Sequence, residues 1–300
     1  MNAAMKKQYV LAFTAILCWS SVATVIKLLL GSLNSIQVLF ISSFFAALAL
    51  LLFNVFTGKM KTLKNFRPKD FIIMILICLP STLLYYVFYY TGTSKMLASQ
   101  AFIVNYLWPI MSVVFACIIL KEKMTVAKLL AIFLSFAGII VIIGEDLLHF
   151  ETQTLFGAVF CILGAVSYGL FTALNQRFKY DKSISMMLSY FVTFIIIGLY
   201  LLISENLPKV GAYEILGLAW NGVATMAVAN MVWILALGNG NTAKISNLAY
   251  LTPFISLVWT AIFLKEKINL LSFLGLAIIM LGILIQILYK DKTPKKKIKE

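Results

Sequence analysis

The sequence predicts an all-α integral membrane protein of ten transmembrane helices, and three observations support this fold class: composition, apolar runs and an internal repeat. Apolar residues make up 62% of the chain and charged residues 12%, against about 45–50% and about 25% in soluble domains. The apolar residues fall in runs of about twenty, the length at which a helix crosses about 30 Å of hydrocarbon. A soluble domain of this composition would leave much of its apolar surface in water.

The runs define the spans in chain order. The first follows Lys6 and Lys7 like the start of a signal peptide, but it is too long and has no small-residue cleavage site, so we interpret it as a span. The predicted spans are 9–30, 36–57, 70–90, 96–119, 126–144, 154–177, 185–204, 213–236, 243–264 and 270–289.

The fourth and fifth spans recur as the ninth and tenth. A shift of 144 residues overlays residues 97–143 on residues 241–287 with fourteen identities and no gap, and a proline, a glycine and a Lys-Glu-Lys triplet fall in register. Because each half has five spans, the two copies cross the membrane in opposite senses, as in many secondary transporters. The predicted parts are a first five-helix repeat at 1–144, an outer linker at 145–153, a second repeat at 154–289 and a polybasic tail at 290–300.

Lysine and arginine are distributed unequally over the loops. Nineteen lie on one side of the ten-span topology, whereas only Lys95, Lys209, Lys265 and Lys267 lie on the other. Positive residues concentrate on cytoplasmic loops, so we expect both termini in the cytoplasm and the chain in a bacterial-type cytoplasmic (inner) membrane. The lysines of the tail are placed to contact anionic lipid headgroups.

Several function classes lack the residues that they need. The chain has no Gly-rich phosphate loop for a nucleotide and no basic soluble domain large enough for nucleic acid, so we expect neither a cofactor nor a nucleic-acid partner. His149 lies beside Glu145 and Asp146 in the outer linker, where a solvated acidic loop is favoured over a metal site. No Asp, Glu or His falls in the middle of a span, so we expect no enzyme and find no candidate for a carboxylate relay.

Polar and aromatic side chains gather in the first, third, fourth, sixth, eighth and ninth spans, which we expect to line a substrate path between the halves. A mid-span amide facing lipid would lose its hydrogen bonds. Buried interhelical hydrogen bonding is the alternative for the amides, and an interfacial belt is the alternative for aromatic residues near helix ends. The candidate substrate-binding residues are Trp19, Tyr86, Tyr89, Asn105, Tyr106, Trp108, Asn230, Trp233 and Tyr250.

Lys27 is the one ionisable side chain well inside a predicted span. It lies three residues from the outer end of the first span, about 4.5 Å along the axis. It therefore either snorkels to the interface or lies on the substrate path.

Backbone breaks and small residues mark further positions. Breaks inside spans act as hinges or as static kinks, and small residues such as Gly138 and Gly282 indicate close helix packing. The Lys-Glu-Lys triplets are interpreted as anchors of helix ends, with gating as the alternative. The hinge candidates are Pro80, Pro109, Gly238 and Pro253.

These residues resemble the drug/metabolite transporter superfamily in its ten-helix EamA branch. The stretch Cys18-Trp19-Ser20-Ser21 with Lys27 is similar to the opening motif of the branch, with Ser20 in place of its Gly. The stretch Asn105-Tyr106-Leu107-Trp108-Pro109, with Trp233 and Gly240-Asn241, looks like the aromatic amino-acid exporters of the branch. Ser42 and Ser43 stand where the branch often has an Arg, so charge pairing by that Arg is absent. The resemblance implies a cavity between the halves that rocking helix bundles open to each side in turn.

The sequence therefore favours a secondary transporter that exports a small metabolite across the cytoplasmic membrane by alternating access. The favoured substrate is an amino acid, with an aromatic amino acid as the narrower hypothesis, because aromatic walls stack on such molecules or attract their ammonium groups. Export of other metabolites or drugs, a channel and a structural membrane protein are the alternatives. The oligomeric state is left open.

Overall fold

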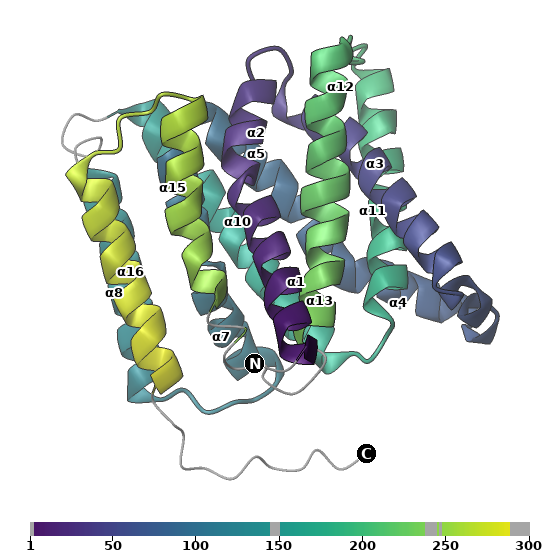
Figure 1. Cartoon of the computed structure of the whole chain (residues 1–300), viewed down its shortest axis with the longest axis horizontal. Helices are drawn as coiled ribbons and strands as arrows, with labels where there is room; N and C mark the ends of the chain where they lie inside the picture. Colours follow the sequence, from purple (N-terminus) through teal and green to yellow (C-terminus); the bar gives the residue numbers. More distant parts are fainter. Residues whose placement is uncertain (1–2, 145–150, 238–244, 246–247, 289–300) are drawn as a thin grey trace.

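The computed structural model describes residues 3–144, 151–237, 245 and 248–288, and every regular element in these ranges is a helix (Figure 1). Eight helical stretches are long and apolar enough to cross a membrane. The two remaining predicted spans, 126–144 and 243–264, correspond to the shorter apolar helices Val126–Ile142 and Ala249–Phe263. The predicted tail, most of the predicted linker and Gly238 lie outside the described residues.

The helices follow the predicted spans in order, with interruptions. The first part of the chain forms α1 (Ala3–Ser20), α2 (Val22–Leu29), α3 (Ser35–Phe56), the 3₁₀ helix η1 (Lys59–Asn65), α4 (Pro68–Leu79), the π-helical η2 (Pro80–Leu84), α5 (Tyr85–Lys95), α6 (Ala98–Asn105), α7 (Trp108–Ile119) and α8 (Val126–Ile142). The second part forms α10 (Thr152–Arg177), α11 (Lys182–Ile203), α12 (Ala212–Ala219), the π-helical η3 (Trp220–Val228), α13 (Ala229–Leu237), the 3₁₀ helix η4 (Ala249–Leu251), α15 (Thr252–Phe263) and α16 (Leu270–Leu288). In Figure 1, α1 begins and α16 ends on the same, lower side of the molecule.

Polar residues at the helix starts explain where the helices begin. The Asn34 side chain accepts the N–H groups of Ile36 at 3.0 Å and Gln37 at 2.9 Å, and the Gln37 side chain accepts the N–H of Asn34 in return. Asp181 caps α11 in the same way through the N–H groups of Ser183 and Ile184. These bonds satisfy donors that a helix N-terminus leaves without partners.

Two spans contain π-helical turns at related positions. The 144-residue shift places Pro80–Leu84 on residues 224–228, which lie within η3. Pro80 has no N–H, so the regular ladder is interrupted there. In η3, the Thr225 hydroxyl donates to the carbonyl of Asn221 at 2.6 Å, a side-chain bond that competes with the backbone ladder. Such turns occur often at functional sites.

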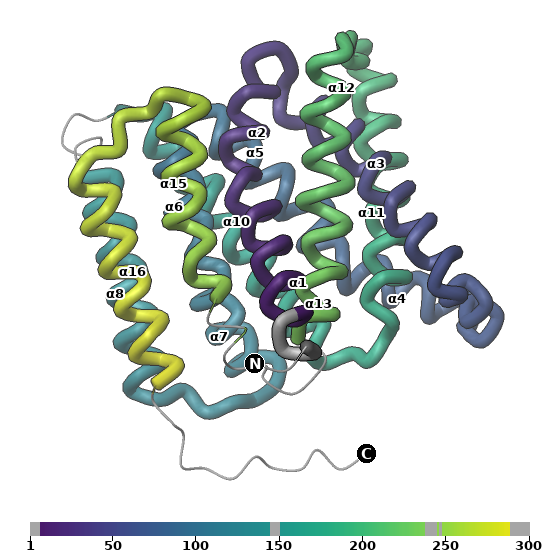
Figure 2. Tube along the Cα trace, viewed as in Figure 1, coloured from purple at the N-terminus to yellow at the C-terminus, as the bar shows by residue number. Residues whose placement is uncertain are grey.

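The largest helix contacts join the two parts of the chain. α8 packs against α16, α10 against α5 and α7, α11 against α3, and α1 against α13. Figure 2 shows α8 and α16 side by side at one edge of the molecule. A Cβ on Gly138 would lie 2.6 Å from the carbonyl of Gly275, and one on Gly282 would lie 2.9 Å from the carbonyl of Ala131. Under the 144-residue shift, Gly138 corresponds to Gly282 and Gly275 to Ala131, so the two contacts are equivalent.

Candidate substrate cavity

A cavity of about 330 Å³ lies among the helices, within the size range of small-molecule sites. Each of the six spans expected to line a path contributes to its wall, and the start of α11 contributes Lys182 and Met186 in addition. Of the candidate substrate-binding residues, the wall contains Trp19, Tyr86, Asn105, Tyr106, Trp108, Asn230 and Trp233.

Two candidates lie outside this wall. Tyr89 is fully buried behind Tyr85, with the two rings stacked at 5.6 Å between centroids and 17° between planes. Tyr250 is half-buried against the core, while Ala249 and Thr252 on either side of it line the cavity. The structure therefore brings the other seven candidates together without these two.

Sequence reasoning missed an aromatic and polar face of α10. Tyr168, Phe171, Thr172 and Asn175 all line the cavity, and their spacing of three, one and three residues puts them on one face of a helix. That stripe is the signal that could have revealed them. Lys182 carried no such signal, because it resembles the other basic residues near helix ends.

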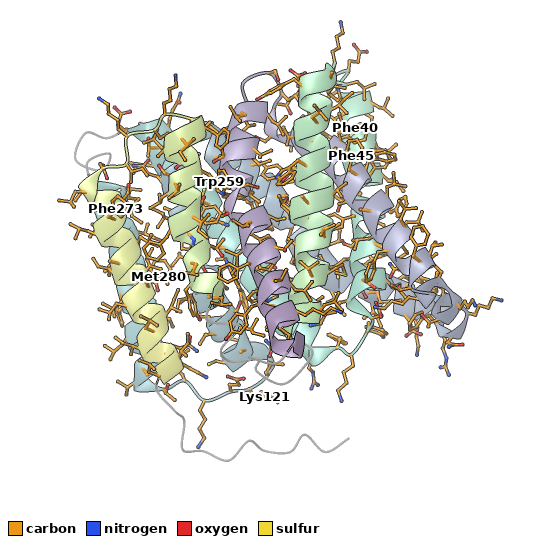
Figure 3. The ribbon with its side chains drawn as sticks, viewed as in Figure 1. Phe40, Phe45, Lys121, Trp259, Phe273 and Met280 are labelled. Atoms are coloured by element: carbon orange, nitrogen blue, oxygen red, sulfur yellow. The ribbon has the colours of Figure 1, made fainter. Side chains whose placement is uncertain are left out.

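The side chains next to Trp19 determine where it lies. The Ser20 hydroxyl accepts the indole N–H of Trp259 at 3.0 Å, and the Ser21 hydroxyl accepts that of Trp220 at 3.0 Å. Trp259 is labelled on α15 in Figure 3. These bonds hold the end of α1 between α15 and η3. Trp19 then meets Trp233 with 5.4 Å between ring centroids and 60° between planes.

The other aromatic group comes from α5, α7 and α10. Tyr168 lies 5.2 Å from Tyr85 and 5.2 Å from Trp108 between ring centroids, in tilted and edge-on arrangements that aromatic pairs prefer. The Asn105 amide donates to the Tyr85 hydroxyl at 3.0 Å. Asn105 thus makes an interhelical hydrogen bond and also lines the cavity, so the two interpretations of this amide are compatible.

Two further contacts connect the wall to the backbone. The Tyr106 hydroxyl donates to the carbonyl of Ala249 at 2.7 Å and joins α6 to η4. The Asn230 amide donates to the carbonyl of Met226 at 2.8 Å, four residues earlier. Asn230 also lines the cavity, so its side chain both binds its own helix and contributes to the wall.

The charge of the wall limits what the cavity can bind. Among the described lining residues, Lys182 is the one formally charged side chain, and none is Asp or Glu. An organic cation would find no counter-ion there, and only aromatic faces and amide or hydroxyl oxygens could attract its charge. The arrangement suits neutral, zwitterionic or anionic molecules with a flat apolar part. The described residues also contain no group of His, Cys, Asp and Glu that could hold a metal ion.

Lys27 lies apart from this cavity. Its ammonium donates to the carbonyls of Thr93 at 2.9 Å and Met96 at 2.5 Å, at the C-terminal end of α5, where carbonyls lack helical partners and a cation is favourable. It lines a separate polar pocket of about 390 Å³ with Lys95 and Asn269. Its place on a substrate path stays a prediction.

The hinge candidates occupy two kinds of position. Pro80 begins the π-helical η2, inside a span. Pro109 and Pro253 lie in the first turns of α7 and α15, where a missing N–H removes no helical bond. These two prolines therefore start helices and do not interrupt them, and their hinge role stays a prediction.

Comparison with known proteins gives a family match over nearly the whole chain. The EamA-like transporter family matches residues 6–144 and again residues 155–288. The chain is 21% identical to the uncharacterized inner membrane transporter YhbE of Escherichia coli, over 91% of this chain and 88% of YhbE. One solved crystal structure covers 93% of this chain and 96% of its own at a TM-score of 0.66 and 18% identity. At that identity the likeness shows the fold alone.

Other relatives align over a shorter stretch. An uncharacterized transporter of Archaeoglobus fulgidus is 25% identical over 55% of this chain and 59% of its own length. The S-adenosylmethionine uptake transporter of Rickettsia prowazekii is 27% identical over 58% of this chain and 59% of its own length. The chain thus spans about three fifths of these proteins.

Proposed function

The chain belongs to the EamA-like transporter family, and from this we propose that it exports amino acids, including aromatic ones, across the cytoplasmic membrane. In this proposal it is a secondary transporter that works by alternating access and has no covalent step. The family and its named relatives are transporters, which is the premise. The substrate and the direction are the parts proposed here.

The observation that carries the proposal is the cavity wall. It has an aromatic pair, Trp19 and Trp233, and a separate aromatic group around Tyr168. A flat side chain can stack against such faces, and an α-ammonium group is attracted by them. The absence of a lining carboxylate among the described residues favours a zwitterion over an organic cation.

We further propose ten spans in two inverted five-helix repeats, at 1–144 and 154–289, with both termini in the cytoplasm. The twofold family match, the exchange of the Gly138–Gly275 and Gly282–Ala131 contacts and the matching π-helical turns support the repeat. The start of α1 and the end of α16 on one side agree with an even number of crossings (Figure 1).

In this topology the cavity opens to the cytoplasm. Lys182, an exposed residue between the end of α10 and the body of α11, lines it on that side. On the opposite side, Lys27 is bound to the end of α5, and Glu266 accepts the N–H groups of Ala98 and Ser99. These bonds tie the outer helix ends together.

Counterflow into proteoliposomes tests the function. Purified protein is reconstituted in vesicles preloaded with one unlabelled amino acid, and uptake of its labelled form is followed. Accumulation with tryptophan or phenylalanine, but not with glutamate or lysine, is expected. If folded protein gives no accumulation with any amino acid, the amino-acid proposal is wrong.

S-adenosylmethionine is the second substrate to include in the panel. One relative is named as its uptake transporter, and the molecule combines a flat adenine ring with an amino-acid group. Counterflow with S-adenosylmethionine in place of tryptophan and phenylalanine would make it the better candidate. Its sulfonium charge has no carboxylate partner among the described lining residues, which favours the amino acids.

Replacing Trp233 tests the aromatic wall directly. Trp233→Ala removes the ring that pairs with Trp19, so tryptophan counterflow should fall about tenfold, as expected when an aromatic contact and its burial are lost. Tyr200→Ala is the control, because Tyr200 is 57% exposed on α11 and does not line the cavity. Equal counterflow in the Trp233 variant and the control would remove Trp233 from the site.

A further inference from the structure

We propose that Lys182 binds the carboxylate of the substrate and makes the transporter select amino acids over derivatives that lack this charge. The inference rests on the proposed function, since it concerns the same cavity. It adds a specificity-determining residue, and it gives the bound molecule a direction, with its carboxylate toward the start of α11 and its apolar part among the aromatic rings.

Lys182 is the charged residue of the cavity wall. It is the one charged side chain among the described residues that line the cavity, and it reaches the wall from an exposed helix end. Aromatic rings on several helices, among them Trp19, Trp233 and Tyr168, make up much of the rest of the wall. A molecule with one anionic end and a flat apolar part matches a wall with one positive charge among aromatic rings.

The acid next to Lys182, Asp181, is bound to partners other than Lys182. The Asp181 carboxylate pairs with Lys59 at 2.8 Å and accepts the Ser183 hydroxyl at 2.7 Å. Burial acts to raise the pKa of Asp181, but hydrogen bonds from Lys59, Ser183 and the N–H of Ile184 outweigh it, so its pKa lies below the usual range. Asp181 therefore stays ionised and is occupied by these partners.

Lys182 itself has no such partner. Within the described part of the chain, no ion pair or hydrogen bond involves its ammonium group. Lys59 compensates the Asp181 charge, so the start of α11 keeps a net positive charge beside the cavity. A carboxylate bound there forms an ion pair with the ammonium group, whereas an amide or ester offers an uncharged oxygen and forms no ion pair.

The test compares tryptophan with tryptophanamide, which has the same ring and ammonium group but no carboxylate. Both are used as counterflow substrates of the full chain, and the half-saturation concentrations are measured. Because exposed ion pairs are worth up to about 1 kcal/mol, Lys182→Gln should raise the half-saturation concentration for tryptophan about fivefold. It should not raise the value for tryptophanamide, a net cation that the charge of Lys182 does not attract, and Lys182→Arg should restore most of the preference.

Lys179→Gln is the matched control, because Lys179 is a nearby exposed lysine that does not line the cavity. It should leave both half-saturation concentrations at the wild-type values. Equal effects of Lys182→Gln on both substrates, or none on either, would overturn the inference while the transport function stands. A wild-type protein that carries neither compound would instead overturn the proposed function, and the inference with it.

Discussion

Two turns of the chain carry the same Leu-Lys-Glu-Lys sequence, one after α7 at 120–123 and one after α15 at 264–267. They also share a backbone. Lys121 has a φ of 56° and Lys265 a φ of 55°. In each turn, the N–H of the glutamate lies 3.4 Å from the carbonyl six residues earlier. Lys121 is labelled near the lower edge of the molecule in Figure 3.

The glutamates of the two turns nevertheless have different partners. The Glu266 carboxylate accepts the N–H of Ala98 at 2.8 Å and of Ser99 at 3.0 Å, and so caps α6. The Glu122 carboxylate is 50% exposed and pairs with Lys128 at 3.0 Å. Under the 144-residue shift, the counterparts of the α6 start are residues 242 and 243, outside the described residues.

This comparison separates local from tertiary control. The repeated sequence produces the same turn twice, because the turn depends on residues within it. The partner of the glutamate depends on tertiary packing: among the described residues, the N–H groups at the start of α6 bind Glu266, whereas the Lys128 side chain binds Glu122. In the proposed topology, the side with Glu266 is tied together and the side with Glu122 is the one to which the cavity opens.

The largest expected effect is a loss of stability at the contact between α8 and α16, where the two halves of the chain pack in the same way. Gly138→Ala would place a Cβ 2.6 Å from the Gly275 carbonyl, whereas Gly282→Ala would place one 2.9 Å from the Ala131 carbonyl. Because the added methyl group would overlap with the backbone, the free energy of unfolding should fall by about 2 kcal/mol for Gly138→Ala and about 1 kcal/mol for Gly282→Ala. Thermal unfolding in detergent measures both. Gly144→Ala is the control, because its Cβ would meet nothing within 4 Å, and equal costs at all three sites would contradict the close contact.

The next effect tests the difference between the glutamates. Glu266→Gln keeps the shape of the side chain but replaces one accepting oxygen by an amide that faces a backbone donor. The free energy of unfolding should fall by about 1.5 kcal/mol, because the two charge-assisted hydrogen bonds to Ala98 and Ser99 are weakened. Glu122→Gln should cost under about 0.5 kcal/mol, because its ion pair is half exposed. Unfolding midpoints of the two variants measure both losses, and a loss under about 0.5 kcal/mol for Glu266→Gln would show that the α6 cap is not stabilising.

The smallest expected effect is a gain in stability at the two Leu-Lys-Glu-Lys turns, and it tests whether their backbones are alike. Lys121→Gly and Lys265→Gly remove a side chain at a positive φ, where glycine is favoured. Relief of the backbone strain at this positive φ exceeds the entropic cost of glycine. The free energy of unfolding of each variant should therefore rise by about 0.5 kcal/mol. The same unfolding measurement applies to both. A gain at one turn with a loss at the other would mean that the two backbones differ in solution.

The sequence predicted the spans well because their cause is local. Apolar runs and capping residues such as Asn34 and Asp181 define helices without reference to distant parts of the chain. The interruptions were harder to see. Pro80 indicated a break, whereas η3 contains no proline. The Asn221 amide within η3 donates to Ser42 and Tyr90 on other helices, and no local pattern shows these contacts.

The cavity wall could be predicted only in part. Asn105, Trp108 and Trp233 were expected there because polar and aromatic side chains gather in their spans and a mid-span amide facing lipid would lose its hydrogen bonds. Tyr89 and Tyr85 lie one turn apart on the same helix, and only packing decided that Tyr85 faces the cavity while Tyr89 is buried behind it. Periodicity identifies a face of a helix but not what lies opposite that face.

By itself, the sequence determined the all-helical membrane class, the order of the apolar helices and the repeated turn, because hydrophobic length and local hydrogen bonding act over a few residues. The tertiary structure alone decided that Ser20 and Ser21 receive tryptophan N–H groups, that Glu266 caps α6, and that Lys182 reaches the cavity. Each of these contacts joins residues far apart in the chain. Their existence depends on how the helices pack, which no local pattern encodes.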